Sequence, residues 1–88
     1  MTRVRIPPTL RQATGGAREV EADGGTVRDV LEDLTTRYDG LRGQVYDGEI
    51  AAFVNVYVDG EDIRFGDALA TPVRDGQDVQ ILPAVAGG

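Results

Sequence analysis

The residues of this sequence best suited to chemistry are the last two, Gly87 and Gly88. Glycine has no Cβ, so such an end can enter a narrow channel on another protein and adopt the backbone angles that an active site requires. The five residues that follow Pro83 are uncharged, and in extended form they reach roughly 15–18 Å. We therefore expect Val85, Ala86 and Gly87 to thread a partner's channel and Gly88 to present its free carboxylate there.

The side chains offer little chemistry of their own. The sequence contains no Cys and no His, which excludes disulfides, thiolate metal sites and a Cys nucleophile, and removes the commonest general base. The carboxylates Asp59, Glu61 and Asp62 lie close together, but their spacing lacks the calcium-loop pattern, so we expect a solvated turn. The protein is therefore predicted to hold no metal, to have no catalytic residue of its own and to use the catalytic groups of a partner.

Composition indicates a single compact domain. The 88 residues are 41% hydrophobic, which is enough for a core, and the formal net charge of −6 argues against nucleic acid or an anionic membrane as a partner. No apolar run reaches membrane-spanning length, and the first residues lack the apolar stretch of a signal peptide. We expect a soluble, monomeric cytoplasmic protein.

Apolar periodicity predicts one helix, over residues 27–38. Thr26 is a suitable N-cap and Gly40 is placed to end the helix. The apolar residues recur at helical spacing, and they are Val27, Val30, Leu31, Leu34 and Tyr38. Residues 39–52 are interrupted by glycine, and we expect a loop with one helical turn.

Alternating apolar residues predict the strands, which lie around Val4 and Ile6, over residues 18–21 and 53–58, at Ile63 and Phe65, and over residues 77–82. This order of elements predicts an α+β fold of the β-grasp (ubiquitin-like) type. Its mixed sheet has four to five strands, with the first and last paired in parallel, and is crossed by one main helix. We expect residues 1–83 to form the domain and residues 84–88 a flexible tail.

Several segments resemble one known family. They are Ile6-Pro7, Thr14–Gly16, Phe53–Val58, Asp62–Phe65 and, above all, Ile81–Gly88. With these segments the sequence resembles the MoaD/ThiS family of prokaryotic sulfur carriers, and within it the CysO-type carriers of cysteine biosynthesis. The resemblance covers nearly the whole chain.

The resemblance implies a mechanism in which partner enzymes act on Gly88. An E1-like adenylating enzyme uses ATP and Mg²⁺ to convert the carboxylate into an acyl-adenylate, and sulfur then displaces AMP to leave a thiocarboxylate. In CysO-type systems a PLP-dependent cysteine synthase-like enzyme accepts the sulfur, and a JAMM-type zinc peptidase releases cysteine. The carrier itself binds no cofactor.

Leu82 is a candidate docking residue. It is out of phase with the inward-facing Val79 and Ile81, so it should emerge on the outer face of the sheet with Phe53 and Tyr57. The resemblance implies that this face docks on the adenylating enzyme. Ordinary packing of Leu82 against the 39–52 loop is the alternative.

Three other functions remain open at this point. The same carrier chemistry could feed the synthesis of molybdopterin, thiamin or a thio-containing natural product. The protein could be a ubiquitin-like modifier whose C-terminus is conjugated to target amines. It could also be an interaction module in which the diglycine is incidental.

Overall fold

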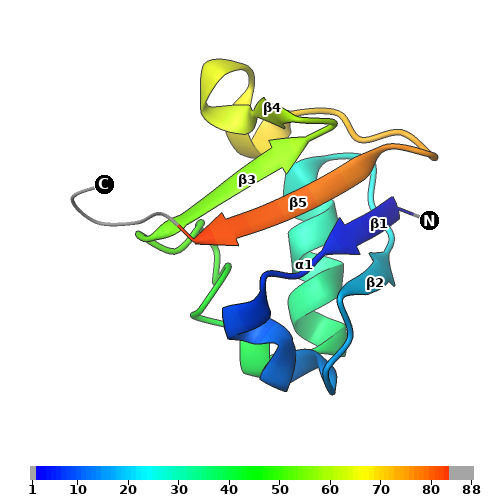
Figure 1. Cartoon of the computed structure of the whole chain (residues 1–88). Helices are drawn as coiled ribbons and strands as arrows, with labels where there is room; N and C mark the ends of the chain where they lie inside the picture. Colours follow the sequence, from blue (N-terminus) through cyan, green and yellow to red (C-terminus); the bar gives the residue numbers. More distant parts are fainter. Residues whose placement is uncertain (1, 84–88) are drawn as a thin grey trace.

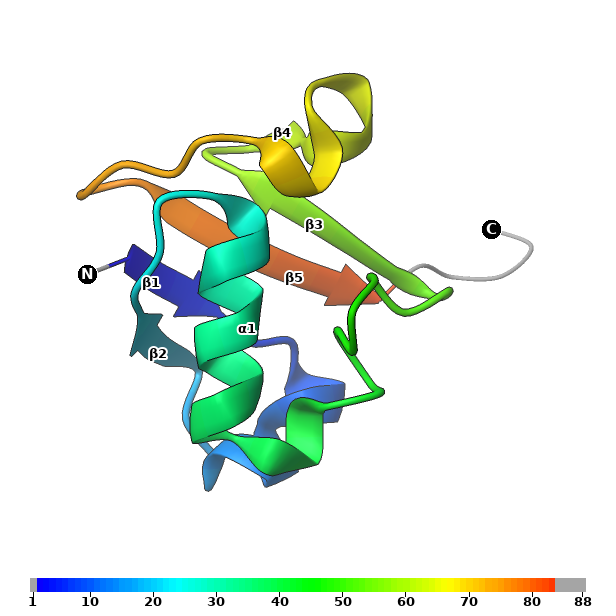
Figure 2. The ribbon, with the colours of Figure 1, turned by 180° about the vertical axis from the view of Figure 1, so that it is seen from behind.

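The computed structural model describes residues 2–83, and its central feature is a five-stranded mixed sheet with one α-helix packed on one face (Figures 1 and 2). The elements are β1 (Thr2–Arg5), β2 (Glu19–Ala22), α1 (Val27–Arg37), β3 (Val54–Val58), β4 (Glu61–Asp62) and β5 (Asp78–Pro83). The tail predicted over residues 84–88 lies outside the described residues. Within residues 2–83, no helix has both the length and the apolar character needed to cross a membrane.

The strand order is β2-β1-β5-β3-β4, which places the last strand at the centre. β5 runs parallel to β1, with Val4 opposite Val79, and antiparallel to β3, with Val56 opposite Ile81. β1 and β2 form the antiparallel hairpin, and β4 pairs with the end of β3. The predicted β-grasp topology, with first and last strands paired in parallel, is confirmed.

The core lies between α1 and the inner face of the sheet, as the rear view in Figure 2 makes clear. Alternate residues of the strands point inward because successive side chains of a strand face opposite sides. The buried residues shared by helix and strands include Val4, Val27, Val30, Leu31, Leu34, Val56, Val79 and Ile81. The predicted inward positions of Val79 and Ile81 are therefore confirmed.

The start of α1 follows the prediction and its end does not. Thr26 Oγ1 accepts a hydrogen bond from the Asp29 backbone N–H at 3.3 Å, as expected for an N-cap. The helix ends at Arg37, and Tyr38 leaves helical geometry at φ −126° and ψ 83°. Gly40 therefore does not end it. The chain turns early into a 3₁₀ helix, η2 (Asp39–Leu41), which brings the fully buried Leu41 into the core.

The prediction of a short strand at Ile63 and Phe65 is wrong. These residues form a 3₁₀ helix, η3 (Ile63–Phe65), and the strand β4 comprises only the two residues before it. The Asp62 carboxylate accepts a hydrogen bond from the Arg64 backbone N–H at 2.9 Å, so it caps the turn that interrupts the strand. Because a 3₁₀ helix turns by about 120° per residue, Ile63 and Phe65 face different sides, and Ile63 is buried while Phe65 is exposed. A further turn, η4 (Ala68–Ala70), follows.

A 3₁₀ helix, η1 (Pro8–Thr14), occupies the segment between β1 and β2 that was expected to be a long loop. Pro7 precedes it in extended conformation, and Gly15 ends it at φ 67°, in the left-handed region that glycine tolerates. Thr14 Oγ1 donates to the Arg11 carbonyl oxygen at 3.1 Å. Pro7 before the segment, Pro8 at its first position and the two glycines after it were the available sequence signals.

The approach of Gly24 to α1 generates a prediction with a matched control. A Cβ at Gly24 would lie 2.5 Å from the Val30 nitrogen, whereas a Cβ at Gly25 would meet nothing within 4 Å. Gly24→Ala should therefore lower the free energy of unfolding by about 1–3 kcal/mol through overpacking. Gly25→Ala should leave it within about 1 kcal/mol of wild type or raise it slightly. Urea unfolding followed by circular dichroism measures both, and equal values for the two variants would contradict this packing.

Candidate functional site

The candidate site is the end of β5, which precedes the predicted tail. In the register with β3, Leu82 lies opposite Asn55 and Pro83 lies opposite Val54. Proline has no N–H to donate, so it is suited to the last position of a paired strand. The predicted threading residues Val85, Ala86 and Gly87 and the predicted reactive residue Gly88 lie outside the described residues.

A hollow of about 280 Å³ lies beside Leu82 and is rich in arginine. Its lining includes Arg5 of β1, Arg11 of η1 and Arg18, which precedes β2, together with Glu19 of β2. Arg11 Nε donates to the Ile6 carbonyl oxygen at 3.2 Å, which holds that side chain against the strand end. Sequence analysis missed this cluster because η1, which supplies Arg11, was not predicted.

A second hollow, of about 330 Å³, lies beside Pro83 and is mainly apolar. Leu10 of η1, Ala52, Phe53 and Val54 contribute to its lining. Phe53 is 67% exposed and belongs to the turn before β3, where the Val54 N–H donates to the Ala51 carbonyl oxygen at 3.1 Å. An exposed phenyl ring beside the strand end offers apolar surface that a partner can cover.

The three predicted docking residues are not gathered in one place. Leu82 and Tyr57 share the outer face of the sheet, because Leu82 is paired with Asn55 and Tyr57 is two residues further along β3. Phe53 lines the other hollow, with Pro83. Residues of β1, η1 and β2 line the hollow beside Leu82, and residues 39–52 do not. The surroundings of this hollow therefore differ from those expected if Leu82 packed against the 39–52 loop.

The loop that leads to Phe53 is anchored by Tyr46. Its side chain is buried, and its hydroxyl donates to Glu32 Oε1 of α1 at 2.9 Å. Burial raises the pKa of the Tyr46 phenol, and the hydrogen bond to Glu32 raises it further. With Leu41 and Val45 also buried, this segment is packed firmly enough to hold Phe53 beside the strand end.

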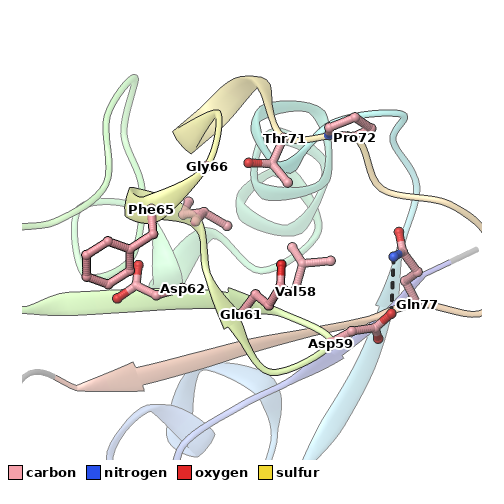
Figure 3. Close-up of a pocket in the computed structure, with 10 residues that line it drawn as sticks. Val58, Asp59, Glu61, Asp62, Phe65, Gly66, Thr71, Pro72 and Gln77 are labelled. Carbon is pink, nitrogen blue, oxygen red and sulfur yellow. Dashed lines mark hydrogen bonds between the residues drawn. The ribbon is translucent and has the colours of Figure 1, made fainter.

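The carboxylates at the β3–β4 turn lie at the opposite end of β3 (Figure 3). Asp59 accepts from Gln77 Nε2 at 3.1 Å and from the Asp78 backbone N–H at 2.9 Å. Hydrogen bonds from the Arg64 side chain and backbone hold the pKa of Asp62 below its usual range. No group of three or more potential metal ligands occurs among residues 2–83. Asp59 and Asp62 are therefore engaged in turn and ion-pair contacts.

Comparison with known proteins relates the chain to a family and to curated relatives. The sequence profile of the ThiS family matches residues 4–88. The sulfur carrier protein CysO of Mycobacterium tuberculosis is 47% identical over 89 residues, covering 97% of this chain and 96% of the relative. The small archaeal modifier protein 3 of Haloferax volcanii is 45% identical over 67 residues, covering 75% of this chain and 73% of the relative.

The fold agrees with a solved structure over the full length. A chain in the crystal structure of the Amycolatopsis orientalis BexX/CysO complex superposes with a TM-score of 0.90 and 44% sequence identity, covering 100% of both chains.

The buried Tyr46 phenol generates a stability prediction. Tyr46→Phe removes the hydrogen bond to Glu32 and should lower the free energy of unfolding by about 1 kcal/mol at neutral pH. Because the folded-state pKa is raised, the phenol in the unfolded chain loses its proton first, at about pH 10, and wild-type stability falls as pH rises from there toward the folded-state pKa. The difference in free energy of unfolding between wild type and Tyr46→Phe should therefore narrow between about pH 9 and about pH 11. Denaturant unfolding of both proteins at the two pH values measures this difference. A difference that does not change with pH would refute the raised pKa of the Tyr46 phenol.

Proposed function

The chain belongs to the ThiS family, and on that basis we propose that it carries sulfur on the carboxylate of Gly88 as a thiocarboxylate, for the biosynthesis of cysteine. The observation that carries this proposal is the near full-length similarity to sulfur carrier proteins of the CysO type, in sequence and in fold. The diglycine that ends the sequence fits the same role.

The chemistry follows from the poor electrophilicity of a carboxylate. An E1-like adenylating enzyme with ATP and Mg²⁺ transfers AMP to the Gly88 carboxylate and releases pyrophosphate. A sulfur nucleophile attacks the acyl carbon, and the bond to the AMP oxygen breaks. The product is a Gly88 thiocarboxylate with free AMP. The partner enzyme performs both steps, and the carrier supplies the carboxylate and the surface that presents it.

The described residues support presentation rather than catalysis. The end of β5 is fixed by pairing to β3, so a tail that starts after Pro83 starts from a rigid point. Leu82 and Phe53 offer apolar surface on either side of Pro83, and Arg5, Arg11 and Arg18 offer positive charge beside Leu82. We propose that Leu82 and Phe53 contact the adenylating enzyme around the mouth of the channel that the tail enters. Tyr57 contributes from further along β3.

Use of the sulfur to make cysteine is supported by the similarity to the CysO relatives. A PLP-dependent cysteine synthase-like enzyme would accept the sulfur, and a JAMM-type zinc peptidase would free cysteine from the carrier. Molybdopterin, thiamin or another thio-product would use the same activated carrier with a different acceptor. The chain resembles one that was solved in a complex of CysO with BexX, and this similarity supports the binding of a partner protein.

Conjugation to target proteins is the second candidate function, because the small archaeal modifier protein 3 is also a relative. The two functions share the adenylation step and differ in the nucleophile. Sulfide leaves a thiocarboxylate on the free carrier, whereas a target amine leaves an amide bond and a covalent adduct of higher mass.

Intact mass spectrometry tests the carrier chemistry directly. The full chain is incubated with ATP, Mg²⁺, a cognate E1-like enzyme and sulfide. We expect the mass gain of one oxygen-to-sulfur exchange, located in the C-terminal peptide and absent when Gly88 is deleted. Absence of the gain with an enzyme that is active on another carrier would refute the proposal. Adducts of higher mass in native extract that disappear on deletion of Gly88 would support the modifier function instead.

Truncation of Leu82 tests docking separately from the tail. Leu82→Ala and Phe53→Ala should each raise the KM for the carrier in adenylation by about tenfold, as expected for loss of an apolar contact worth about 1–2 kcal/mol. The kcat should change little because the reacting carboxylate is untouched. Tyr57→Ala should have a smaller effect because Tyr57 is further from Pro83.

Arg74→Ala is the control for these variants. Arg74 is exposed in the turn before β5, at the other end of the strand from Leu82, so its truncation should leave KM unchanged. Unfolding curves verify that each variant is folded. Equal KM values for Leu82→Ala, Phe53→Ala and Arg74→Ala would exclude the proposed docking site.

A further inference from the structure

A hollow of about 700 Å³ lies at the end of the sheet opposite the candidate site, and nothing in the proposed carrier function uses it. It is bounded by the β3–β4 turn on one side and by the η3–η4 segment on the other (Figure 3). We call it the β4 hollow, and the residues that define it here are Val58, Glu61, Ile63, Phe65 and Thr71.

The floor of the β4 hollow is apolar and its rim carries an exposed aromatic ring. Val58 and Ile63 are buried core residues whose surfaces form part of the lining. Phe65 is 88% exposed, although most phenylalanines in folded proteins are buried. An exposed ring beside an apolar floor is a surface that gains free energy when another apolar surface covers it.

Two polar groups of the hollow lack partners among the described residues. Glu61 is exposed on the edge strand β4, and its carboxylate makes no ion pair or hydrogen bond within residues 2–83. Thr71 Oγ1 is buried with no hydrogen-bond partner there. The Thr71 backbone is fixed, since its N–H donates to Ala68 and its carbonyl oxygen accepts from Val27, both at 3.0 Å. The free Glu61 carboxylate suits a ligand that carries positive charge and donates hydrogen bonds.

The negative charge around the β4 hollow indicates that the ligand carries positive charge. Asp59 and Asp62 stand on the same rim as Glu61, and Arg64 neutralises only Asp62. A guanidinium or ammonium group would donate to the Glu61 carboxylate, and a cation near Phe65 would gain from its ring face. An apolar neighbour on the ligand would cover Val58 and Ile63.

We propose that the β4 hollow docks a segment of a partner protein that carries an arginine or lysine beside an apolar residue. A polypeptide fits better than a free cation because Phe65 is buried only when a larger apolar surface lies over it. Five residues of β3 separate the hollow from Pro83, a span of about 13 Å between Val54 and Val58. A partner bound there leaves the end of β5 open to a second enzyme. This docking does not depend on the chemistry of Gly88.

The probe is a blocked dipeptide, N-acetyl-leucyl-arginine amide, titrated into the ¹⁵N-labelled full chain at millimolar concentration. We expect amide shifts at Glu61, Phe65 and Thr71, with the isosteric neutral probe N-acetyl-leucyl-citrulline amide binding about fivefold more weakly. Glu61→Gln should weaken binding of the arginine probe by a similar factor, and Phe65→Ala should weaken its binding as well. Glu21→Gln, the same change on the exposed face of β2, should leave binding unchanged.

The possible results separate the proposal from its competitors. Absence of shifts, shifts confined to other acidic residues, or equal binding by wild type and Glu61→Gln would each overturn it. Equal affinity for butylguanidinium and for the arginine dipeptide would identify a site for a small cation, which also overturns docking of a polypeptide segment. Loss of probe binding in Glu61→Gln with thiocarboxylate formation intact would separate this site from the carrier function.

Discussion

The pairing of β5 on both sides is the constraint on which the rest of the structure depends. β5 is parallel to β1 and antiparallel to β3, so the last strand of the chain is the central strand of the sheet. The position of Pro83 is consequently fixed by the whole sheet and by the core under it.

Charge is distributed unevenly along the long direction of the sheet. Although the net charge is −6, arginines from three separate segments meet beside Leu82, and carboxylates meet at the β3–β4 turn. Surface charges of this kind add little to stability, but they orient partners and bias which surfaces approach each other. In the carrier function proposed above, such surfaces would present the carboxylate to a partner enzyme.

The elements with strong local signals were predictable from sequence, and the elements that depend on tertiary contacts were not. The periodicity of Val27 to Leu34 and the alternation of β3 and β5 require only that one face be apolar. The helix end was missed because burial of Leu41 overrides the glycine signal at Gly40. The strand predicted at Ile63 and Phe65 does not form because the Asp62 side chain caps the Arg64 N–H, a competition between side chain and ladder that periodicity does not reveal.

The features of the candidate site divide in the same way, into those that local sequence predicts and those that depend on tertiary contacts. The outward position of Leu82 followed from its phase within the strand, since strand alternation places it on the face opposite to Val79 and Ile81. The arginine cluster beside it could not be predicted, because Arg5, Arg11 and Arg18 meet only when η1 folds back toward the end of β5. A 3₁₀ helix is a short element with weak propensity, so its position is set by Pro7 and Gly15 at its ends and by the core beneath it. The surroundings of Leu82 therefore arise from the assembled fold, whereas its outward phase can be read from the strand alone.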